Sequence, residues 1–180
     1  MGKLAVFGPK HTFHDIARRK YIPHLVHSYF ETFEEMFSAL EKGDVTQALV
    51  AVSNNNAGLV GDNLERIERE FKIIEKFELP IKLFIGSRFP NSLESIKKIF
   101  SHPMAIKQTQ KYFRKYSHIK FIATSSTAAA IDEVSKSNDK NAAVISSKSA
   151  LEASSLLTIF ENVEDKVDNA TTFCLIEAKR

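Results

Sequence analysis

Short apolar runs alternate with segments of helical periodicity along the chain. We expect strands over 3–7, 25–30, 48–52, 72–86 (interrupted by a proline), 96–101, 120–123, 142–145, 157–161 and 173–176, and helices over 12–21, 32–43, 63–71, 103–116 and 125–137 and from 147 onward. Strands separated by helices are typical of parallel sheets with helices on both faces. The pattern therefore predicts an α/β fold.

Helix-start signals precede several of the periodic segments. Thr32 and Glu35 have the spacing of a capping box, and Gly43 fits the end of the same helix. Thr12 precedes another periodic segment, at a position where hydroxyl side chains cap helices. Pro103 fits the first turn of a helix. These signals support the expected helix starts independently of the apolar periodicity.

The strand and helix pattern occurs twice, with a break at Pro80. One apolar run, Phe173 to Ile176, is left over at the end, preceded by a polar turn at 168–172. We expect this run to return to the first half as a strand, because burial of so apolar a segment is favoured over its exposure to water. The prediction is two lobes, 1–80 with 168–180 and 81–167, joined by two crossings. Ligands of such folds bind outside the carboxyl ends of the strands, between the lobes.

Composition and charge argue against several classes of protein. The chain has 180 residues, a net charge of +3 and one cysteine, Cys174, so no internal disulfide can form. No dense Lys/Arg block is present, which argues against a nucleic acid partner. No run reaches the length of a membrane span and no signal peptide is evident, so we expect a cytoplasmic protein without a membrane partner. A weakly basic domain suits a small anionic ligand.

Polar side chains recur in the turns that follow the expected strands. They lie at Thr12, Ser53, Asn54, Asn55, Ser101, His102, Ser125, Ser126, Thr127, Ser146 and Ser147. Helix N-termini carry free N–H groups and partial positive charge, so several of them converging would bind a small polycarboxylate. The alternative is that these side chains only cap helices. Their recurrence at every carboxyl-end turn favours the anion site.

Other candidates for chemistry are few. The six histidines lack metal-ligand spacing, and no phosphate loop or dinucleotide fingerprint is present, so we expect neither a metal nor a cofactor. His102 either reaches the ligand or caps a helix. We interpret Cys174 as an inert core thiol. Phe173 is expected beside the ligand, and the neighbouring hydroxyls Thr171 and Thr172 are expected to face it.

Six motifs, in order, resemble those of the prephenate dehydratase family. Gly8-Pro9-Lys10-His11-Thr12-Phe13 is similar to the family's Gly-Pro-x-Gly-Thr-Phe, and Thr124-Ser125-Ser126-Thr127-Ala128 to its Thr-Ser-Ser-Thr-Ala. The others are Val52-Ser53-Asn54-Asn55, Leu79-Pro80-Ile81, Ser101-His102-Pro103 and Asn169-Ala170-Thr171-Thr172-Phe173. The resemblance covers nearly the whole chain.

The resemblance implies a two-lobed, periplasmic-binding-protein type II-like catalytic domain. It implies a cofactor-independent lyase that converts prephenate, a small dicarboxylate, to phenylpyruvate in phenylalanine biosynthesis, and it implies a homodimer. Thr171 would assist departure of the substrate hydroxyl. The substrate-binding residues would be Thr12, Ser53, Asn54, Asn55, Ser101, His102, Ser125, Ser126, Thr127, Thr172 and Phe173. The sequence leaves no room for the phenylalanine-sensing ACT domain that usually follows, so feedback control by that route is not expected.

The motifs also depart from the family's pattern. The Arg of the terminal motif is Thr172 here, a Glu is replaced by Ser53, and the second Gly of the first motif is His11. Arg forms a bidentate pair with a carboxylate that Thr cannot replace. Prephenate decarboxylases, relatives that release CO2 but keep the hydroxyl, have lost the same motif. Three functions stay open: a dehydratase, a non-aromatising decarboxylase and a non-catalytic carboxylate-binding domain.

Overall fold

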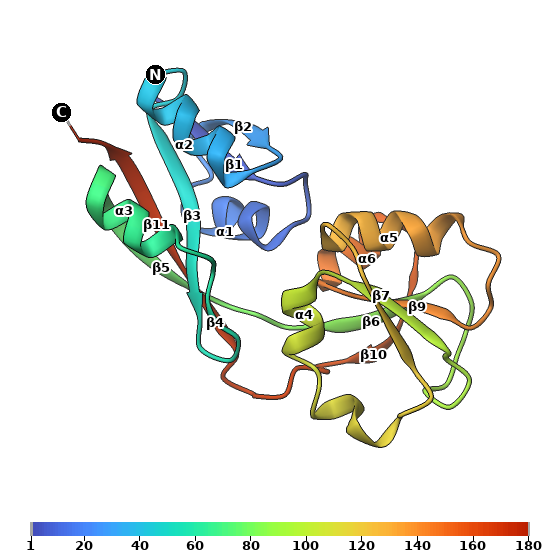
Figure 1. Cartoon of the computed structure of the whole chain (residues 1–180). Helices are drawn as coiled ribbons and strands as arrows, with labels where there is room; N and C mark the ends of the chain where they lie inside the picture. The colour runs from blue at the N-terminus through green and yellow to red at the C-terminus, as the bar shows by residue number, and fades with distance from the viewer. Residues whose placement is uncertain (1, 180) are drawn as a thin grey trace. The chain divides into compact units, whose positions relative to one another are not determined.

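The structure, a computed structural model, describes residues 2–179. The chain forms two compact units (Figure 1). The first runs to Pro80 and resumes at Ala170, and the second comprises Ile81–Asn169. The chain returns to the first unit between Asn169 and Ala170, two residues later than the return after residue 167 that the sequence predicts. Each unit has its own sheet and its own helices, as an α/β fold requires.

The sheet of the first unit has the strand order β2-β1-β3-β11-β5, with β4 paired to β3. Its strands are β1 (Lys3–Phe7), β2 (Val26–Phe30), β3 (Gln47–Asn54), β4 (Gly58–Leu59), β5 (Phe71–Pro80) and β11 (Ala170–Ala178). β2, β1 and β3 run parallel, but β11 runs antiparallel to both β3 and β5. The sheet is mixed, and not wholly parallel as expected, because β11 enters it from the second unit and not from a helical crossover.

Three helices cover this sheet: α1 (Phe13–Tyr21), α2 (Phe33–Lys42) and α3 (Asn63–Glu70). Thr32 and Glu35 form the expected capping box, and a left-handed glycine ends α2 as expected. α2 and α3 pack on one face of the sheet, and α1 packs on the other. The expected arrangement of helices on both faces is confirmed.

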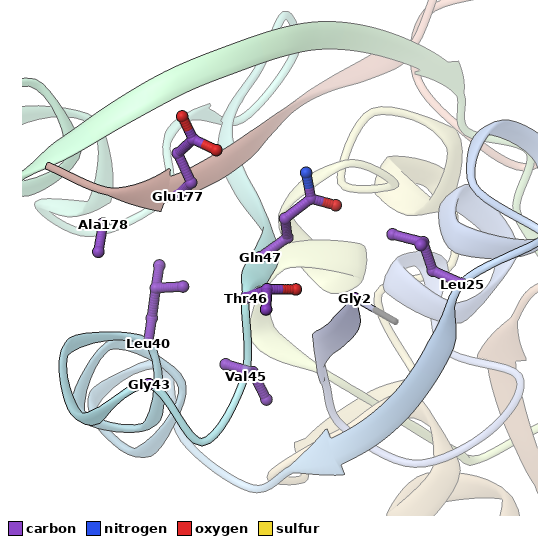
Figure 2. Close-up of a pocket in the computed structure, with 9 residues that line it drawn as sticks. All are labelled: Gly2, Leu25, Leu40, Gly43, Val45, Thr46, Gln47, Glu177 and Ala178. Carbon is purple, nitrogen blue, oxygen red and sulfur yellow. The ribbon is translucent and has the colours of Figure 1, made fainter. Parts of the chain in front are cut away.

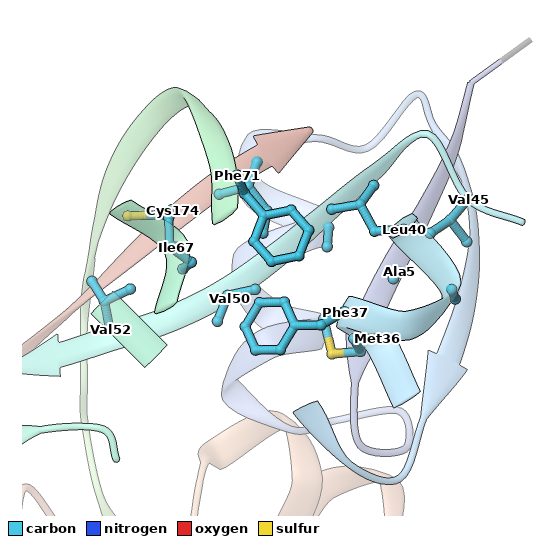
Figure 3. Close-up of a cluster of buried hydrophobic side chains, with 13 residues drawn as sticks. Ala5, Met36, Phe37, Leu40, Val45, Val50, Val52, Ile67, Phe71 and Cys174 are labelled. Atoms are coloured by element: carbon cyan, nitrogen blue, oxygen red, sulfur yellow. The ribbon is translucent and has the colours of Figure 1, made fainter. Parts of the chain in front are cut away.

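A cluster of buried apolar side chains joins α2 and α3 to the sheet (Figure 3). Its labelled members are Ala5, Met36, Phe37, Leu40, Val45, Val50, Val52, Ile67, Phe71 and Cys174. Phe37 and Phe71 stack with ring centroids 5.2 Å apart. The guanidinium carbon of Arg66 lies 4.5 Å from the Phe37 ring centroid, and its nitrogens pair with Glu34 and Glu70. Each large side chain fully buried here contributes about 1.5–3 kcal/mol to the free energy of unfolding.

β3 carries a bulge near its carboxyl end. Val52 and Ser53 of β3 lie opposite the single residue Thr172 of β11. A bulge adds one residue to one strand and changes the direction of the side chains that follow. Asn54, the next residue, consequently lies opposite Thr171 with its side chain on the same face.

The sheet of the second unit has the strand order β10-β6-β9-β7-β8. Its elements are β6 (Phe84–Ser87), β7 (Lys98–Ser101), α4 (Pro103–Lys107), the 3₁₀ helix η1 (Tyr112–Lys115), β8 (Lys120–Ala123), α5 (Thr127–Lys136), β9 (Ala142–Ser146), α6 (Lys148–Ala153) and β10 (Leu157–Glu161). β7 runs parallel to β8 and β9, and β6 runs antiparallel to β9 and β10. This sheet is also mixed.

α5 and α6 enclose the core of the second unit against β9 and β6. Leu151 of α6 is fully buried and packs directly onto Gly86 of β6. A Cβ at Gly86 would lie 2.4 Å from Leu151 Cδ2, a distance that no real contact tolerates. Gly86 is therefore the residue that lets α6 approach this strand closely.

The helix expected over 103–116 is wrong in length. α4 ends at Lys107, and turns lead from it to η1. The Thr109 hydroxyl bonds to the carbonyl of Ile106 over 3.0 Å, and the Asp165 carboxylate accepts the backbone N–H of Tyr112 over 2.8 Å. Side chains that bond backbone groups in this way compete with continued helix.

Candidate functional site

Thr171 and Thr172 lie within β11 and not in the polar turn expected before it. Threonine is β-branched and favours strands, and this segment pairs with β3 and β5 at once. Thr171 shares its face of the sheet with Phe173, which contacts His14 of α1. Thr172 faces the other side, as Cys174 does in the cluster beneath α2 and α3. The two neighbouring hydroxyls therefore point to opposite faces.

Asn54 holds the Thr171 side chain from the neighbouring strand. Its amide nitrogen donates to Thr171 Oγ1 over 3.0 Å and to the Ala170 carbonyl over 2.9 Å. Its amide oxygen accepts the backbone N–H groups of Asn56, at 2.9 Å, and Ala57, at 2.8 Å. These bonds fix which end of the amide faces Thr171. Asn54 is 3% exposed and Thr171 9%.

The Thr171 hydroxyl accepts this hydrogen bond and keeps its own hydrogen. Within residues 2–179 its one hydrogen-bond partner is the Asn54 amide. The hydroxyl hydrogen is therefore available to an acceptor that a ligand brings. A donor whose direction is fixed before the reaction is the type of group that stabilises charge developing on an oxygen.

Ser53 and Asn54 belong to β3 and not to the expected turn, because β11 and β4 both pair with the end of β3. Asn55 follows the strand. Its side-chain oxygen accepts the N–H of Ala170 over 2.9 Å, and its own N–H donates to the Ala170 carbonyl over 3.0 Å. Asn55 thus fixes the start of β11. Ser53 is half-buried and lies opposite Thr172, on the face away from Thr171.

The turn between β1 and α1 is left-handed at Gly8 and His11, with φ of 74° and 69°. Residues with a Cβ rarely adopt this conformation, which accounts for the glycine that the similar family motif has at the position of His11. Thr12 caps α1: its Oγ1 accepts the N–H of Asp15 over 3.3 Å and donates to the Pro9 carbonyl over 3.0 Å. Its hydroxyl hydrogen is therefore used within the turn.

The Asp15 carboxylate accepts three hydrogen bonds beside this turn and forms an ion pair with Arg19. Oδ2 accepts from the His11 N–H at 2.9 Å and lies 3.1 Å from Arg19 Nη2. Oδ1 accepts from Arg18 Nη2 at 2.8 Å and from the Tyr29 hydroxyl at 2.7 Å. Burial disfavours the charged carboxylate, but these bonds and the Arg19 charge outweigh it and lower the pKa of Asp15 to about 2. Burial and the bond to Asp15 raise the pKa of Tyr29.

Phe173 lies in the core, and the structure does not place its ring at an open surface. It is fully buried, with its ring centroid 5.0 Å from that of His14 in an edge-on contact. His14 Nε2 accepts the N–H of Ala51 over 3.2 Å, which ties α1 to β3. Cys174 is also fully buried, and burial raises the pKa of its thiol. The interpretation of Cys174 as a core thiol is confirmed.

In the second unit, Ser101 and His102 follow β7. Ser101 is fully buried, and its hydroxyl donates to the Ile145 carbonyl over 2.8 Å. His102 caps α4, its Nδ1 accepting the N–H of Met104 over 3.2 Å. Burial lowers the pKa of His102, so the ring is neutral at pH 7 and carries its hydrogen on Nε2. His102 therefore performs the capping role and also presents a donor.

Hydroxyl groups gather at the start of α5. Ser126 caps the helix by accepting the N–H of Ala129 over 3.0 Å, and Thr124 donates to the Ser126 carbonyl over 2.8 Å. Ser125 is exposed and Thr127 is 9% exposed. Neither of these two side chains has a hydrogen-bond partner within the described part of the chain. Ser125 and Thr127 therefore keep full hydrogen-bonding capacity, whereas Ser126 does not.

The first unit also has a hollow of 440 Å³ near the starts of β1 and β3 and the end of β11, the opposite end of that strand from Thr171 (Figure 2). It is lined by Gly2, Leu25, Leu40, Gly43, Val45, Thr46, Gln47, Glu177 and Ala178. Thr46 accepts the Lys3 N–H over 2.9 Å, and Glu177 pairs with Lys72 over 2.9 Å. Its lining is mostly apolar and two of its polar side chains are engaged elsewhere, so we place no chemistry there.

Within 2–179, no three side chains of His, Cys, Asp or Glu gather as a metal site. In the same range, no helix combines the length and apolar character needed to cross a bilayer.

Sequence reasoning missed two residues near the first turn, Asp15 and His14, and the orienting role of Asn54, which it had named only as a substrate-binding candidate. The spacing of Thr12 and Asp15 resembles a capping box and was a usable signal for Asp15. The orienting role of Asn54 depends on the bulge in β3, and the aromatic surroundings of His14 depend on pairing between distant strands. Neither has a local signal in the sequence.

The family model and the curated relatives agree on one family. The family model "Prephenate dehydratase" matches residues 4–180. This chain belongs to the prephenate dehydratase family. The prephenate dehydratase of Lactococcus lactis subsp. cremoris is 30% identical over 178 residues, which cover 97% of this chain and 63% of that protein. The chain spans 47% of the length of another curated member, so it corresponds to about half to two thirds of such proteins.

Solved structures show the fold. The prephenate dehydratase of Arthrobacter aurescens, solved in complex with L-Phe, has a TM-score of 0.85 at 22% identity, covering 99% of this chain and 61% of that one. The methionine-binding protein MetQ has a TM-score of 0.56 at 10% identity, covering 99% of this chain and 83% of that one. The expected fold, that of prephenate dehydratases and type II periplasmic binding proteins, is confirmed.

Proposed function

We propose that this member of the prephenate dehydratase family converts prephenate to phenylpyruvate, CO2 and water, as a lyase of phenylalanine biosynthesis. The ring carboxylate leaves as CO2, and its bonding electrons enter the ring. The ring hydroxyl leaves with its electron pair and takes up one proton to become water. The ring becomes aromatic, which supplies much of the driving force. The protein must hold the substrate and assist the departing oxygen.

The observation that carries this proposal is the hydrogen bond from the Asn54 amide to Thr171 Oγ1. Because the amide donates, the Thr171 hydroxyl can only donate onward with its own hydrogen. An alcohol does not release its proton at neutral pH, so Thr171 stabilises the departing oxygen by a hydrogen bond while the proton comes from solvent. One such donor lowers the barrier by about 2–4 kcal/mol.

The other predicted substrate-binding residues fall into groups according to the hydrogen bonds that their side chains already form within the protein. We assign substrate contact to His102, Ser125 and Thr127, which keep donor capacity within the described residues. The residues that fix backbone and strand ends are Thr12, Asn54, Asn55 and Ser126. Ser101 and Phe173 are buried in the core and support the proposed site from there. Residues 1–80 with 168–180 and 81–167 act, in this proposal, as the lobes of a single catalytic domain.

A decarboxylase that keeps the substrate hydroxyl is the second candidate. The observation in its favour is Thr172, which stands where the family motif has Arg and faces away from Thr171. Loss of a bidentate carboxylate anchor changes how the substrate is held. A decarboxylase must deliver a proton to ring carbon, and the retained Thr171 donor instead favours loss of the hydroxyl.

The product of purified protein and prephenate at neutral pH separates these functions. We expect phenylpyruvate to form faster than in the protein-free control, with mass loss of both CO2 and water and with aromatic proton signals. A product that has lost only CO2 and lacks aromatic signals would establish the decarboxylase. Protection of the protein by prephenate against heat, with no product, would establish a binding domain.

A further inference from the structure

Asp15 and Thr12 form a variant of the capping box at the start of α1. Thr12 is the cap and accepts the N–H of Asp15, three residues later. In an ordinary capping box the acidic side chain accepts the N–H of the cap residue itself. Here Asp15 accepts the N–H of His11, one residue earlier. The carboxylate therefore holds a residue outside the helix.

That residue is in an unfavourable conformation. His11 has φ of 69°, in the left-handed region that glycine adopts freely and other residues avoid. Such a residue persists only when its surroundings hold it. The bond of 2.9 Å from the His11 N–H to Asp15 Oδ2 is a contact that holds it there.

The carboxylate cannot turn away from His11, because its other oxygen is held from two elements. Oδ1 accepts from Arg18 of α1 and from the Tyr29 hydroxyl of β2. Arg19 adds a second guanidinium next to Oδ2. The Asp15 side chain is 3% exposed and that of Arg18 is 12% exposed, so water competes little for these bonds. The turn is thereby fastened to both α1 and β2.

We propose that Asp15 is a positioning residue of the prephenate site: through the His11 N–H it holds the turn from Gly8 to Thr12 in the conformation that binds the substrate. This inference rests on the proposed function and deepens it. Asp15 does not touch the substrate. Its effect should therefore appear in substrate binding, and it should depend on whether residue 11 needs to be held.

The first test compares Asp15→Asn with a matched control, Asp139→Asn. Asp139 also accepts one backbone N–H, from Asn141, and pairs with one cation, Lys98. We expect Asp15→Asn to raise KM for prephenate about tenfold with kcat changed by less than about threefold, and Asp139→Asn to change neither. Unchanged KM in Asp15→Asn, or an equal change in both variants, would overturn the proposal.

The second test is rescue by glycine. In His11→Gly the turn adopts a left-handed φ without being held. We therefore expect KM of the double variant Asp15→Asn/His11→Gly to return to within about threefold of that of His11→Gly alone. A tenfold rise in KM from Asp15→Asn that persists in the glycine background would show that Asp15 acts elsewhere.

Amide hydrogen exchange tests positioning without reference to turnover. We expect Asp15→Asn to speed exchange of the His11 N–H about tenfold or more while Ala17, in the middle of α1, keeps its rate. Equal acceleration of both amides would mean that Asp15 only stabilises α1, and it would overturn the inference.

If the wild type fails to convert prephenate, the proposed function fails, and this exchange result still decides the role of Asp15. Should Asp15→Asn not fold, Tyr29→Phe removes one donor and should speed the His11 amide about threefold, again sparing Ala17.

Discussion

The side-chain amide of Asn54 donates a hydrogen bond to the hydroxyl of Thr171 across two antiparallel strands, over 3.0 Å. The pair owes its alignment to the bulge in β3, which puts both side chains on one face. Because the Asn54 oxygen is bonded to two backbone N–H groups, the amide cannot flip without losing both. Thr171 is thus oriented as a donor before any ligand arrives.

Thr171→Val should lower kcat for prephenate by about 30- to 1,000-fold, which corresponds to about 2–4 kcal/mol of lost transition-state stabilisation. KM should change little. The Asn54 amide keeps the Ala170 carbonyl as an acceptor, so the free energy of unfolding should fall by about 1 kcal/mol or less. Steady-state kinetics and urea unfolding measure these values. Thr171→Ser, which keeps the hydroxyl, is the control, and full activity in the valine variant would remove Thr171 from the mechanism.

Thr172→Arg should leave KM for prephenate unchanged, because Thr172 faces the opposite side of β11 from Thr171 and a guanidinium there would lie away from the Thr171 hydroxyl. Thr172 is half-buried at the start of β11, so a long side chain has room to extend. Thr172→Gln, long but uncharged, is the control and should also leave KM unchanged. A KM that falls in the arginine variant alone would mean that the guanidinium reaches a substrate carboxylate and forms the bidentate pair of the similar family motif.

The stability of the protein should depend on the charge of Asp15 at acid pH. The folded pKa of Asp15 is about 2 and the ordinary value is 3.8, so the carboxylate stabilises the fold fully above about pH 4. That contribution is lost as the pH falls through about 2. The difference corresponds to about 2 kcal/mol. In urea titrations, the wild type should lose this much more unfolding free energy than Asp15→Asn between about pH 5 and pH 2. Parallel pH profiles would contradict the assigned pKa.

Gly86→Ala should destabilise the protein by about 1–3 kcal/mol, because the added methyl group overlaps Leu151 in a filled core. Leu151→Ala alone should cost about 2–5 kcal/mol through the cavity that it leaves. The two changes should compensate, so that the double variant loses less than the sum of the single losses. Thermal or urea unfolding of the four proteins measures the coupling, and strict additivity would show that Leu151 moves away freely.

Local signals were enough for most of the helices and strands. Hydroxyl side chains ahead of an apolar periodicity predict helix starts at Thr12, Thr32, Ser147 and either Ser125 or Ser126. The structure confirms the caps at Thr12, Thr32 and Ser147, and it shows Ser126 as the cap of α5. The prediction of a helix over 103–116 failed because contacts of Thr109 and Asp165 end the helix early. Asp165 comes from a distant segment of the chain.

The strand ends of the first unit could not be read locally. Ser53 and Asn54 are typical turn residues, and Thr171 and Thr172 directly follow the polar residues Asp168 and Asn169. All four nevertheless extend β3 and β11, because each pairs with a residue far away in the chain. The faces of Thr171 and Thr172 follow from that pairing. The sequence therefore identified these polar positions as candidates, while strand pairing decided which of them orients a donor.

The place of β11 between β3 and β5 has a consequence for synthesis on the ribosome. In the first sheet, β3 and β5 are joined only by β11, which lies between them. β11 emerges from the ribosome after the whole of Ile81–Asn169 has been made. Until then the sheet of the nascent first unit is split, with unpaired strand edges that can associate with other chains. The second unit is continuous in sequence and needs no later segment for its own sheet. The half of the protein that is made second can therefore finish folding first.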